Sequence, residues 1–358
     1  MNTVTIWKRC LGALIAVLLM PPAQAQESDR PLRVCVSSTD VRALVEAVGG
    51  NAVDVTGFVK GADDPHVVAA SRGMIEALSS ADLLIVVGNG LEEAWLPDML
   101  AQARNSDVLA GGTRHLDLSE NLRTIAGPEG RGVPSSFHPE DNPHFLIDPV
   151  EGVKAAGTIA AKLSEIDPVN AVGFEERYRT LASAVMTELF GEDVASAHTA
   201  EELEELSIAV ELGEFAEHLK RHGKRTAELG GQLAAFEAFR DTPVVGDHDL
   251  WPYLARRYGV RVLGYLEPSP GVPPTTRHLT KLISEMKARD ARVILTVTYF
   301  DPRHARFVAE ATDSVIVPMA NNPGSRPETG TYLEWIRYNG RVLLEALSEQ
   351  ASKEGGDD

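Results

Sequence analysis

Three histidines occupy polar, proline-containing segments in which an imidazole could bind a metal ion. They are His66 in the segment GADDPH, His144 in NPHFLIDP and His248 in VVGDHDLWPY. Neutral imidazole is a good ligand for zinc, copper and nickel. Local metal motifs have much closer spacing than the 78 and 104 residues that separate these histidines. Only the fold could bring them together, so the sequence raises a three-histidine site as a hypothesis.

Each histidine has at least one carboxylate close to it in the sequence. Asp64 precedes His66, Asp148 follows His144, and Asp247 and Asp249 flank His248. A metal-bound imidazole commonly donates its second N–H to such an acceptor, which fixes the orientation of the ring. We therefore expect these aspartates to support the three histidines.

The elements that must position these residues follow an alternating pattern. Short β-branched runs alternate with amphipathic helical patterns, which indicates βα units and a mostly parallel sheet. The predicted strands lie at 32–37, 53–59, 82–87, 243–245, 261–265, 293–297 and 314–317. The predicted helices lie at 41–48, 74–78, 91–102, 250–258, 276–289, 302–311 and 332–347. Ligands of such sheets bind beyond the carboxyl ends of the strands, which is where His66 and His248 fall.

A long helical stretch, residues 169–190, separates the two series of βα units. It is entered through Asp167-Pro168 and left at Gly191, which matches helix start and stop signals. Its length of about 33 Å suits a stiff connection between two lobes, so we expect little movement on ligand binding. The predicted fold is α/β, with two lobes of mostly parallel sheet joined by one long rigid helix. The predicted organisation is a signal peptide (1–25), an N-terminal lobe (26–166), a linking helix (167–191), a C-terminal lobe (192–350) and a disordered tail (351–358).

The first residues have the features of a cleavable secretory signal. Lys8 and Arg9 precede an apolar run at 11–20, and the small-residue stretch that follows ends at Ala25, near which we expect cleavage. The run is about half the length of the roughly 20 apolar residues that span a membrane. Cleavage would leave Cys35 as the only cysteine, in an apolar run that favours a buried thiol without a disulfide partner.

The charge of the chain limits the choice of partners. The formal net charge is −18, and nucleic-acid binding would need a basic face, which this sequence lacks. An acidic surface attracts cations weakly, and it is equally compatible with simple solubility.

As a set, these motifs resemble the zinc/manganese cluster (A-I) of periplasmic solute-binding proteins that serve ABC transporters, and within it the zinc-type members. The resemblance rests on DDPH, NPHFLIDP, DHDLWPYLARRYG and GYLEPSPGVPP, and it extends over nearly the whole chain after residue 25. It implies a metal buried between two α/β lobes, bound by His66 and His144 from the first lobe and by His248 from the second. It also implies a monomeric, non-enzymatic periplasmic protein that delivers its metal to an ABC permease and the associated ATPase.

The chain departs from the family pattern at two places. Many members supply a fourth, carboxylate ligand where this chain has Met319 or a neighbour of it. Many zinc-type members also carry a long His-rich loop, but the corresponding stretch 127–141 contains only His138. We expect an ordinary flexible loop there. At the fourth metal position we expect water or hydroxide, steadied by Asp247 or Glu267.

Zinc is the leading metal, because three neutral imidazoles suit zinc whereas manganese prefers sites richer in carboxylates. Copper, nickel and cobalt also accept such a set. Two other functions remain open. An exported zinc hydrolase could use three histidines and a water, although the sequence has no His-Glu-x-x-His motif. An adhesion or interaction module could hold zinc structurally.

Overall fold

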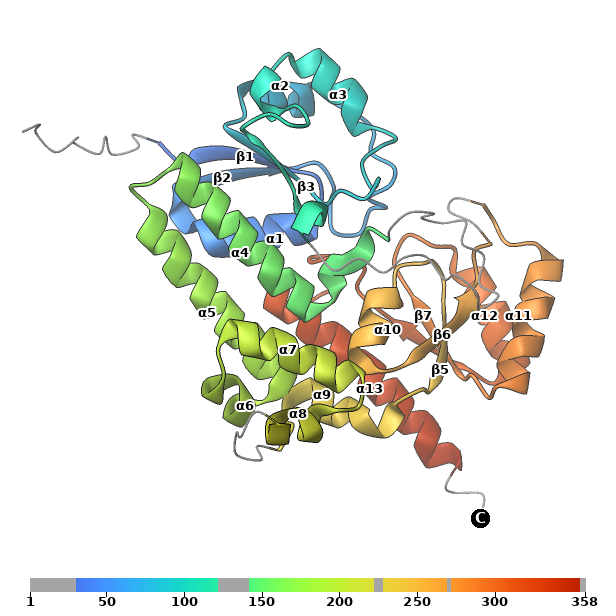
Figure 1. Ribbon diagram of the computed structural model, residues 1–358. Coiled ribbons are helices and arrows are strands. Elements are labelled where there is room, and N and C mark those ends of the chain that lie inside the picture. Colours follow the sequence, from blue (N-terminus) through green and yellow to red (C-terminus); the bar gives the residue numbers. More distant parts are fainter. Residues whose placement is uncertain (1–29, 122–141, 222–227, 269–271, 355–358) are drawn as a thin grey trace, which may run out of the picture.

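Two parallel β-sheets form the framework of the molecule. The computed structural model describes residues 30–121, 142–221, 228–268 and 272–354, and the two sheets of these described residues have four strands each (Figure 1). The first sheet has the order β2-β1-β3-β4, from β1 (Leu32–Val36), β2 (Val53–Gly57), β3 (Leu83–Val86) and β4 (His115–Asp117). The second has the order β6-β5-β7-β8, from β5 (Pro243–Gly246), β6 (Arg261–Tyr265), β7 (Val293–Thr296) and β8 (Val315–Pro318). All the pairings are parallel, so the α/β fold class is confirmed.

The central strands consist of apolar residues because helices cover both faces of each sheet. In the first sheet, alternate residues of β1 pack on α1 (Thr39–Gly49) or toward α2 (Arg72–Ser80) and α3 (Leu96–Ala103). In the second sheet, α10 (Pro252–Tyr258) covers one face, and α11 (Thr276–Ala288) and α12 (Pro302–Thr312) cover the other. Cys35 lies on the α2–α3 side as a buried free thiol, as predicted.

Several boundaries differ from the sequence prediction for local reasons. Helix α3 begins at Leu96 rather than near Leu91, because turns that include the positive-φ residues Gly88, Asn89 and Gly90 occupy the preceding residues. Strand β4 was not predicted, since its three residues, HLD, contain no apolar run. The sequence pattern therefore identified the buried strands and missed this short edge strand.

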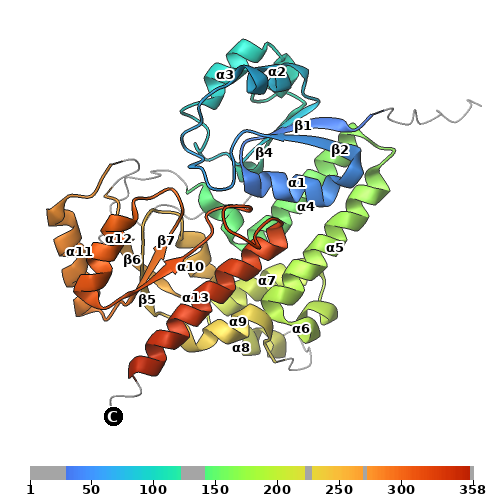
Figure 2. The same cartoon turned by 180° about the vertical axis from the view of Figure 1, so that it is seen from behind.

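A long helix, α5, joins the two lobes as predicted, and a second helix accompanies it. Helix α4 (Pro149–Ile166) packs along α5 (Ala171–Phe190), which has 20 residues and starts later than predicted. Figures 1 and 2 show α5 passing from α1 of the first lobe to a group of helices beside the second sheet. These are α6 (Glu192–Ala197), α7 (Ala200–Glu211), α8 (Phe215–Arg221) and α9 (Gly231–Phe236). Gly191, with φ of 81°, ends α5 as its position predicted.

The last helix, α13 (Tyr332–Glu354), runs from the junction of the lobes toward the C-terminus (Figure 2). It is longer than predicted and extends into the segment that we expected to be a disordered tail. The residues after Leu347 are mostly polar, so they carry no apolar signal, but Lys353 pairs with Glu349 at 2.9 Å one turn earlier. Among the described residues, no helix is both long and apolar enough to cross a membrane.

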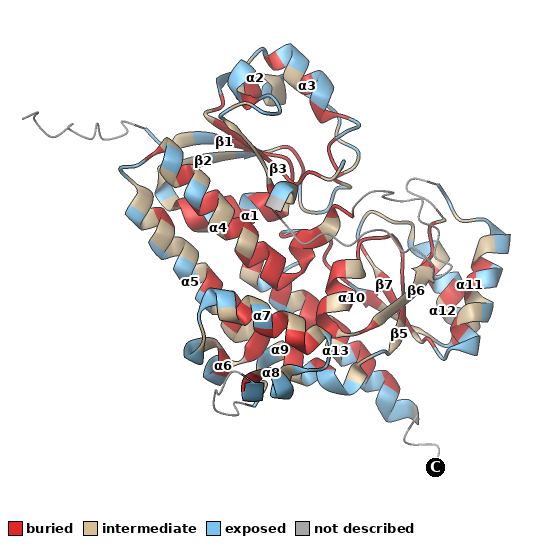
Figure 3. Ribbon diagram, in the orientation of Figure 1, coloured by how far each residue is buried: buried red, intermediate tan, exposed pale blue. Residues whose placement is uncertain are grey.

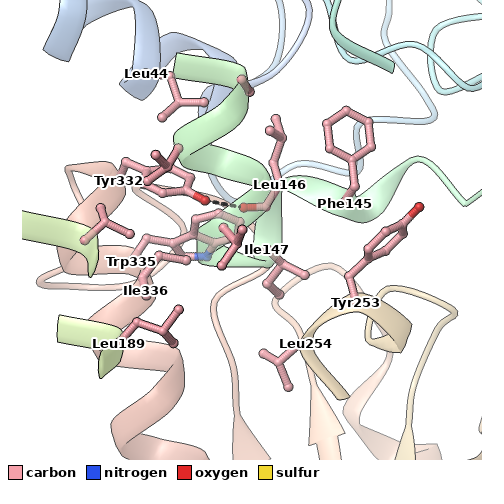
Figure 4. Packing of buried hydrophobic residues seen from close by; sticks show 14 of the residues in the cluster. Leu44, Phe145, Leu146, Ile147, Leu189, Tyr253, Leu254, Tyr332, Trp335 and Ile336 are labelled. Carbon is pink, nitrogen blue, oxygen red and sulfur yellow. Dashed lines mark hydrogen bonds between the residues drawn. The ribbon is translucent and has the colours of Figure 1, made fainter. Parts of the chain in front are cut away.

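One hydrophobic core continues from the first lobe into the second. Figure 4 shows Leu44 of α1, Leu189 of α5, Leu254 of α10 and Trp335 of α13 around the segment that contains Leu146. Figure 3 shows that buried residues gather where α4, α10 and α13 approach one another. The lobes are therefore packed against each other and not merely tethered.

Candidate metal centre

The structure brings the three predicted histidines together. One ring nitrogen from each histidine lies within 4.8 Å of those of the other two, and the ring centroids are 5.1 to 5.6 Å apart. His66 lies in the loop after β2, His144 begins a short 3-10 helix (His144–Ile147), and His248 follows β5. His248 is buried, whereas His66 and His144 are partly exposed. Residues 182 positions apart thus face one another between the two sheets.

The loop of His66 is held by its own aspartate. Asp64 Oδ1 accepts the backbone N–H of His66 at 3.0 Å and lies 2.8 Å from the ring Nδ1. Burial opposes ionisation of Asp64, but the hydrogen bonds from the His66 ring and backbone outweigh it and lower the pKa of the carboxyl. The preceding carbonyl, of Pro65, accepts the indole N–H of Trp95 at 3.1 Å. The predicted pairing of His66 with Asp64 is present, and it leaves Nε2 as the ring nitrogen on the opposite side.

His144 is positioned through a hydrogen bond from its backbone N–H, and not through the expected contact of its ring with Asp148. Asn142 Oδ1 accepts the His144 N–H at 2.8 Å, and Asn142 Nδ2 donates to the carbonyl of Asp249 at 2.8 Å. The expected partner, Asp148, instead accepts the N–H of Val150 as the N-cap of α4 and pairs with Arg257 at 2.8 Å. The prediction that Asp148 supports His144 was wrong, because a buried guanidinium and a helix N-terminus engage this carboxylate.

His248 is held by a carboxylate distant in sequence. Glu267 Oε2 lies 2.8 Å from the His248 Nδ1, and both side chains are buried. Glu267 follows β6, the neighbour of β5 in the sheet, and the ring of Phe300 stacks on the imidazole with centroids 5.6 Å apart. The expectation that Asp247 or Asp249 supports the His248 ring was therefore wrong.

Asp247 and Asp249 have structural contacts of their own. Asp247 accepts backbone N–H groups from Val297 at 2.5 Å and from His248 at 2.9 Å, and burial raises its pKa to about 7. Burial also raises the pKa of Asp249, against the effect of a hydrogen bond from Tyr265. Short side chains beside His248 thus hold the loop, and the longer glutamate reaches the ring.

Contacts between the lobes place the His66 loop against the second lobe. Asn321 Nδ2 donates to the carbonyl of Gly61 at 3.2 Å, and Thr298 Oγ1 donates to that of Ala62 at 3.1 Å. A Cβ at Gly61 would lie 2.5 Å from the carbonyl carbon of Gly324, so only glycine fits this approach. The geometry of the three histidines therefore depends on both lobes.

The position that we compared with a family carboxylate has another role. Met319 is fully buried in the main hydrophobic core, and its carbonyl accepts the Arg326 Nε–H at 3.0 Å. The stretch with His138 lies outside the described residues, so its lack of a metal role stays a prediction.

Comparisons with known proteins agree with this architecture. The family model for the periplasmic component A of zinc-uptake complexes matches residues 34–189 and 195–346. The high-affinity zinc uptake system protein ZnuA of Brucella suis biovar 1 (strain 1330) is 22% identical over 210 residues, which make up 58% of this chain and 50% of that protein. The match thus spans about half the length of this relative.

Two solved structures resemble nearly the whole chain. The solute-binding protein FpvC of Pseudomonas aeruginosa, solved with Ni²⁺, has a TM-score of 0.65 at 18% identity, covering 90% of this chain and 98% of its own. The laminin-binding protein Lmb of Streptococcus agalactiae has a TM-score of 0.63 at 22% identity, covering 88% and 98%. At these identities the likeness shows the fold, whereas the family model covers most of the sequence itself. By that match, this chain belongs to the family of periplasmic zinc-uptake component A proteins.

Proposed function

We propose that this chain is a periplasmic solute-binding protein that captures a divalent transition metal, zinc first, and delivers it to an ABC permease and its ATPase for uptake. His66, His144 and His248 would be the metal ligands. The observation that carries the proposal is the convergence of three imidazoles from both lobes, with ligand atoms within 4.8 Å of one another. Family membership supports the transport role.

The donor set favours zinc over the harder metals. Zinc holds imidazole nitrogens at about 2.0–2.1 Å, which places them about 3.3 Å apart in a tetrahedron. The rings need at most a small inward movement to reach that spacing. Carboxylates beside the Nδ1 atoms of His66 and His248 would orient these rings toward the ion. Manganese prefers more oxygen ligands, although FpvC, which shares the fold, has been solved with Mn²⁺ as well as Ni²⁺.

Binding and release fit the site better than catalysis does. A metal-dependent hydrolase needs a general base free to act on a bound water. Near the histidines, and within the described part of the chain, Asp64 and Glu267 contact imidazoles and Asp247 accepts backbone N–H groups. These contacts support a carrier rather than a hydrolase. We further propose that it is exported through a signal cleaved near Ala25 and acts as a monomer.

Single substitutions test the ligand set directly. Replacing His66, His144 or His248 with Ala should each weaken zinc binding by roughly 100-fold or more, since loss of a ligand exceeds the 10–100-fold effect of losing a supporting group. Competition titration with a chromophoric chelator gives the affinities, and metal analysis of protein purified from the periplasm identifies the native ion. His198→Ala is the matched control, because its ring contacts the Val194 carbonyl at 2.8 Å, away from the site. Small, equal losses for all four variants would refute the three-histidine site.

Delivery is tested in cells. A strain that lacks this protein should grow poorly when zinc is chelated, and the wild-type gene should restore growth while the His144→Ala gene should not. If both genes restored growth, metal delivery by the histidine site would be contradicted. The alternative function, an interaction module that holds zinc structurally, would then be favoured.

A further inference from the structure

The partly buried side chain of Tyr299 contacts Phe300, whose ring stacks on His248. Tyr299 belongs to the loop that follows β7, and its hydroxyl oxygen is buried without a hydrogen-bond partner among the residues that the structure describes. Burial of a hydroxyl without a partner is unfavourable, and such groups are rare in folded proteins. Among the described residues, the hydroxyl therefore has an unmet hydrogen-bonding capacity that a bound ligand could satisfy.

Its neighbours place this hydroxyl at the junction of the lobes. The Tyr299 ring contacts that of Phe300 at 4.7 Å between centroids, and Phe300 stacks on His248. Burial, together with the nearby carboxylates of Asp64, Asp247 and Glu267, raises the pKa of the phenol well above its usual value. Asp64 contacts the ring of His66 and Glu267 contacts that of His248, so two of the charges that act on this phenol belong to carboxylates that hold the histidines.

Three imidazoles leave one position of a tetrahedral ion open. The carboxylates that could fill it have other contacts, since Glu267 lies against His248 and Asp247 accepts backbone N–H groups. Met319 is packed in the core. Asp247 and Glu267 are thus already engaged, whereas the Tyr299 oxygen is one of the buried side-chain atoms that have no hydrogen-bond partner among the described residues.

We propose that the hydroxyl oxygen of Tyr299 is the fourth ligand of the metal bound by His66, His144 and His248. This inference rests on the proposed function and specifies the site further. As the oxygen–metal bond forms, the phenol proton leaves to the solvent, and the phenolate offsets one of the two positive charges of the ion. A buried ion on three neutral imidazoles lacks such compensation, which makes an anionic oxygen favourable.

The test compares Tyr299→Phe, which removes only the oxygen, with Tyr338→Phe, which removes a hydroxyl that bonds to the Pro318 carbonyl at 2.8 Å on the second lobe. Tyr299→Phe should bind Zn²⁺ about 10- to 100-fold more weakly than wild type, and Tyr338→Phe should bind it equally well. Cu²⁺-loaded wild type should show a visible phenolate-to-copper charge-transfer band that Tyr299→Phe lacks and Tyr338→Phe keeps. Because the band is measured on the wild-type protein, this part of the test does not depend on whether a variant folds.

Absence of the band from wild type would overturn direct ligation, even if zinc affinity fell in Tyr299→Phe. Unchanged zinc affinity in Tyr299→Phe would overturn it as well. The His144→Ala variant, measured in parallel, separates this failure from failure of the proposed function. If His144→Ala binds zinc more weakly than wild type, the three-histidine site stands even when Tyr299 is not a ligand. If His144→Ala binds zinc as well as wild type, both the three-histidine site and the Tyr299 ligand are refuted.

Discussion

At the scale of single residues, the carboxylates on the outer nitrogens of the imidazoles determine what the site can do. A carboxylate against Nδ1 favours the tautomer with its proton there, which leaves Nε2 as the lone-pair donor and raises its basicity. Glu267 has this place beside His248, and Asp64 has it beside His66. These residues would affect affinity without touching the ion.

Glu267→Gln tests this role. The neutral amide accepts the His248 N–H less strongly, so zinc affinity should fall by about 10- to 100-fold while the fold is kept. Competition titration against Glu345→Gln, an exposed change on α13, gives the comparison. Equal affinity in the two variants would mean that Glu267 does not tune the His248 ring.

At the scale of elements, a buried ion network joins the segments that carry two of the histidines. Asp148 caps α4 just after the His144 segment, and Arg257 lies on α10 just after His248. The Arg257 guanidinium bonds to Asp148 at 2.8 and 2.9 Å and lies 3.1 Å from Glu211 of α7. Tyr332 of α13 donates to the Leu146 carbonyl at 2.6 Å beside this network (Figure 4). The two histidine segments are thus fixed to one another.

Loss of Arg257 should therefore destabilise the whole protein. The Arg257→Met change leaves the fully buried Asp148 carboxylate without its main partner, which costs about 3–5 kcal/mol of unfolding free energy. Arg256→Met should cost less, because Arg256 is more exposed and its contact with Asp148 is longer, 3.3 Å. Urea unfolding of the metal-free variants measures both. Similar losses in the two would contradict a special role for Arg257.

At the scale of the whole molecule, the carboxyl ends of the strands of both sheets face the three-histidine site. His66, His248, Glu267 and Tyr299 all follow strands, and α5, α13 and the continuous core hold the sheets in fixed relation. Ligand atoms that already lie close together need little rearrangement. We therefore expect the lobes to move only slightly when metal binds.

Metal binding should then appear mainly as added stability. A ligand of the folded state alone stabilises it by about 4 kcal/mol at a thousandfold excess over Kd, so zinc should raise the Tm by several degrees. Imidazoles bind metal only when deprotonated, so the rise should shrink as the pH falls from 7.5 toward 5. Calorimetry with zinc and with EDTA measures it. A rise equally large at pH 5 would show that histidines do not carry the site.

The sequence by itself determined the α/β class and the buried strands, because these follow from apolar periodicity. It raised the three histidines as candidate ligands through their place near strand ends and through the family resemblance. It could not show β4, whose residues carry no apolar run, or the last turns of α13, which are largely polar. The sequence pattern therefore predicts the elements whose formation depends on a local run of apolar residues.

Tertiary structure alone decided which groups surround the histidines. Proximity in sequence favoured Asp148 and Asp247, but Arg257 engages the first and backbone N–H groups engage the second. Glu267, 19 residues from His248, reaches the ring only because β6 pairs with β5. Tyr299 gave no sequence signal, since an aromatic residue after a strand is typical of the core. Its hydroxyl became a candidate ligand because the tertiary structure buries it without a hydrogen-bond partner among the described residues.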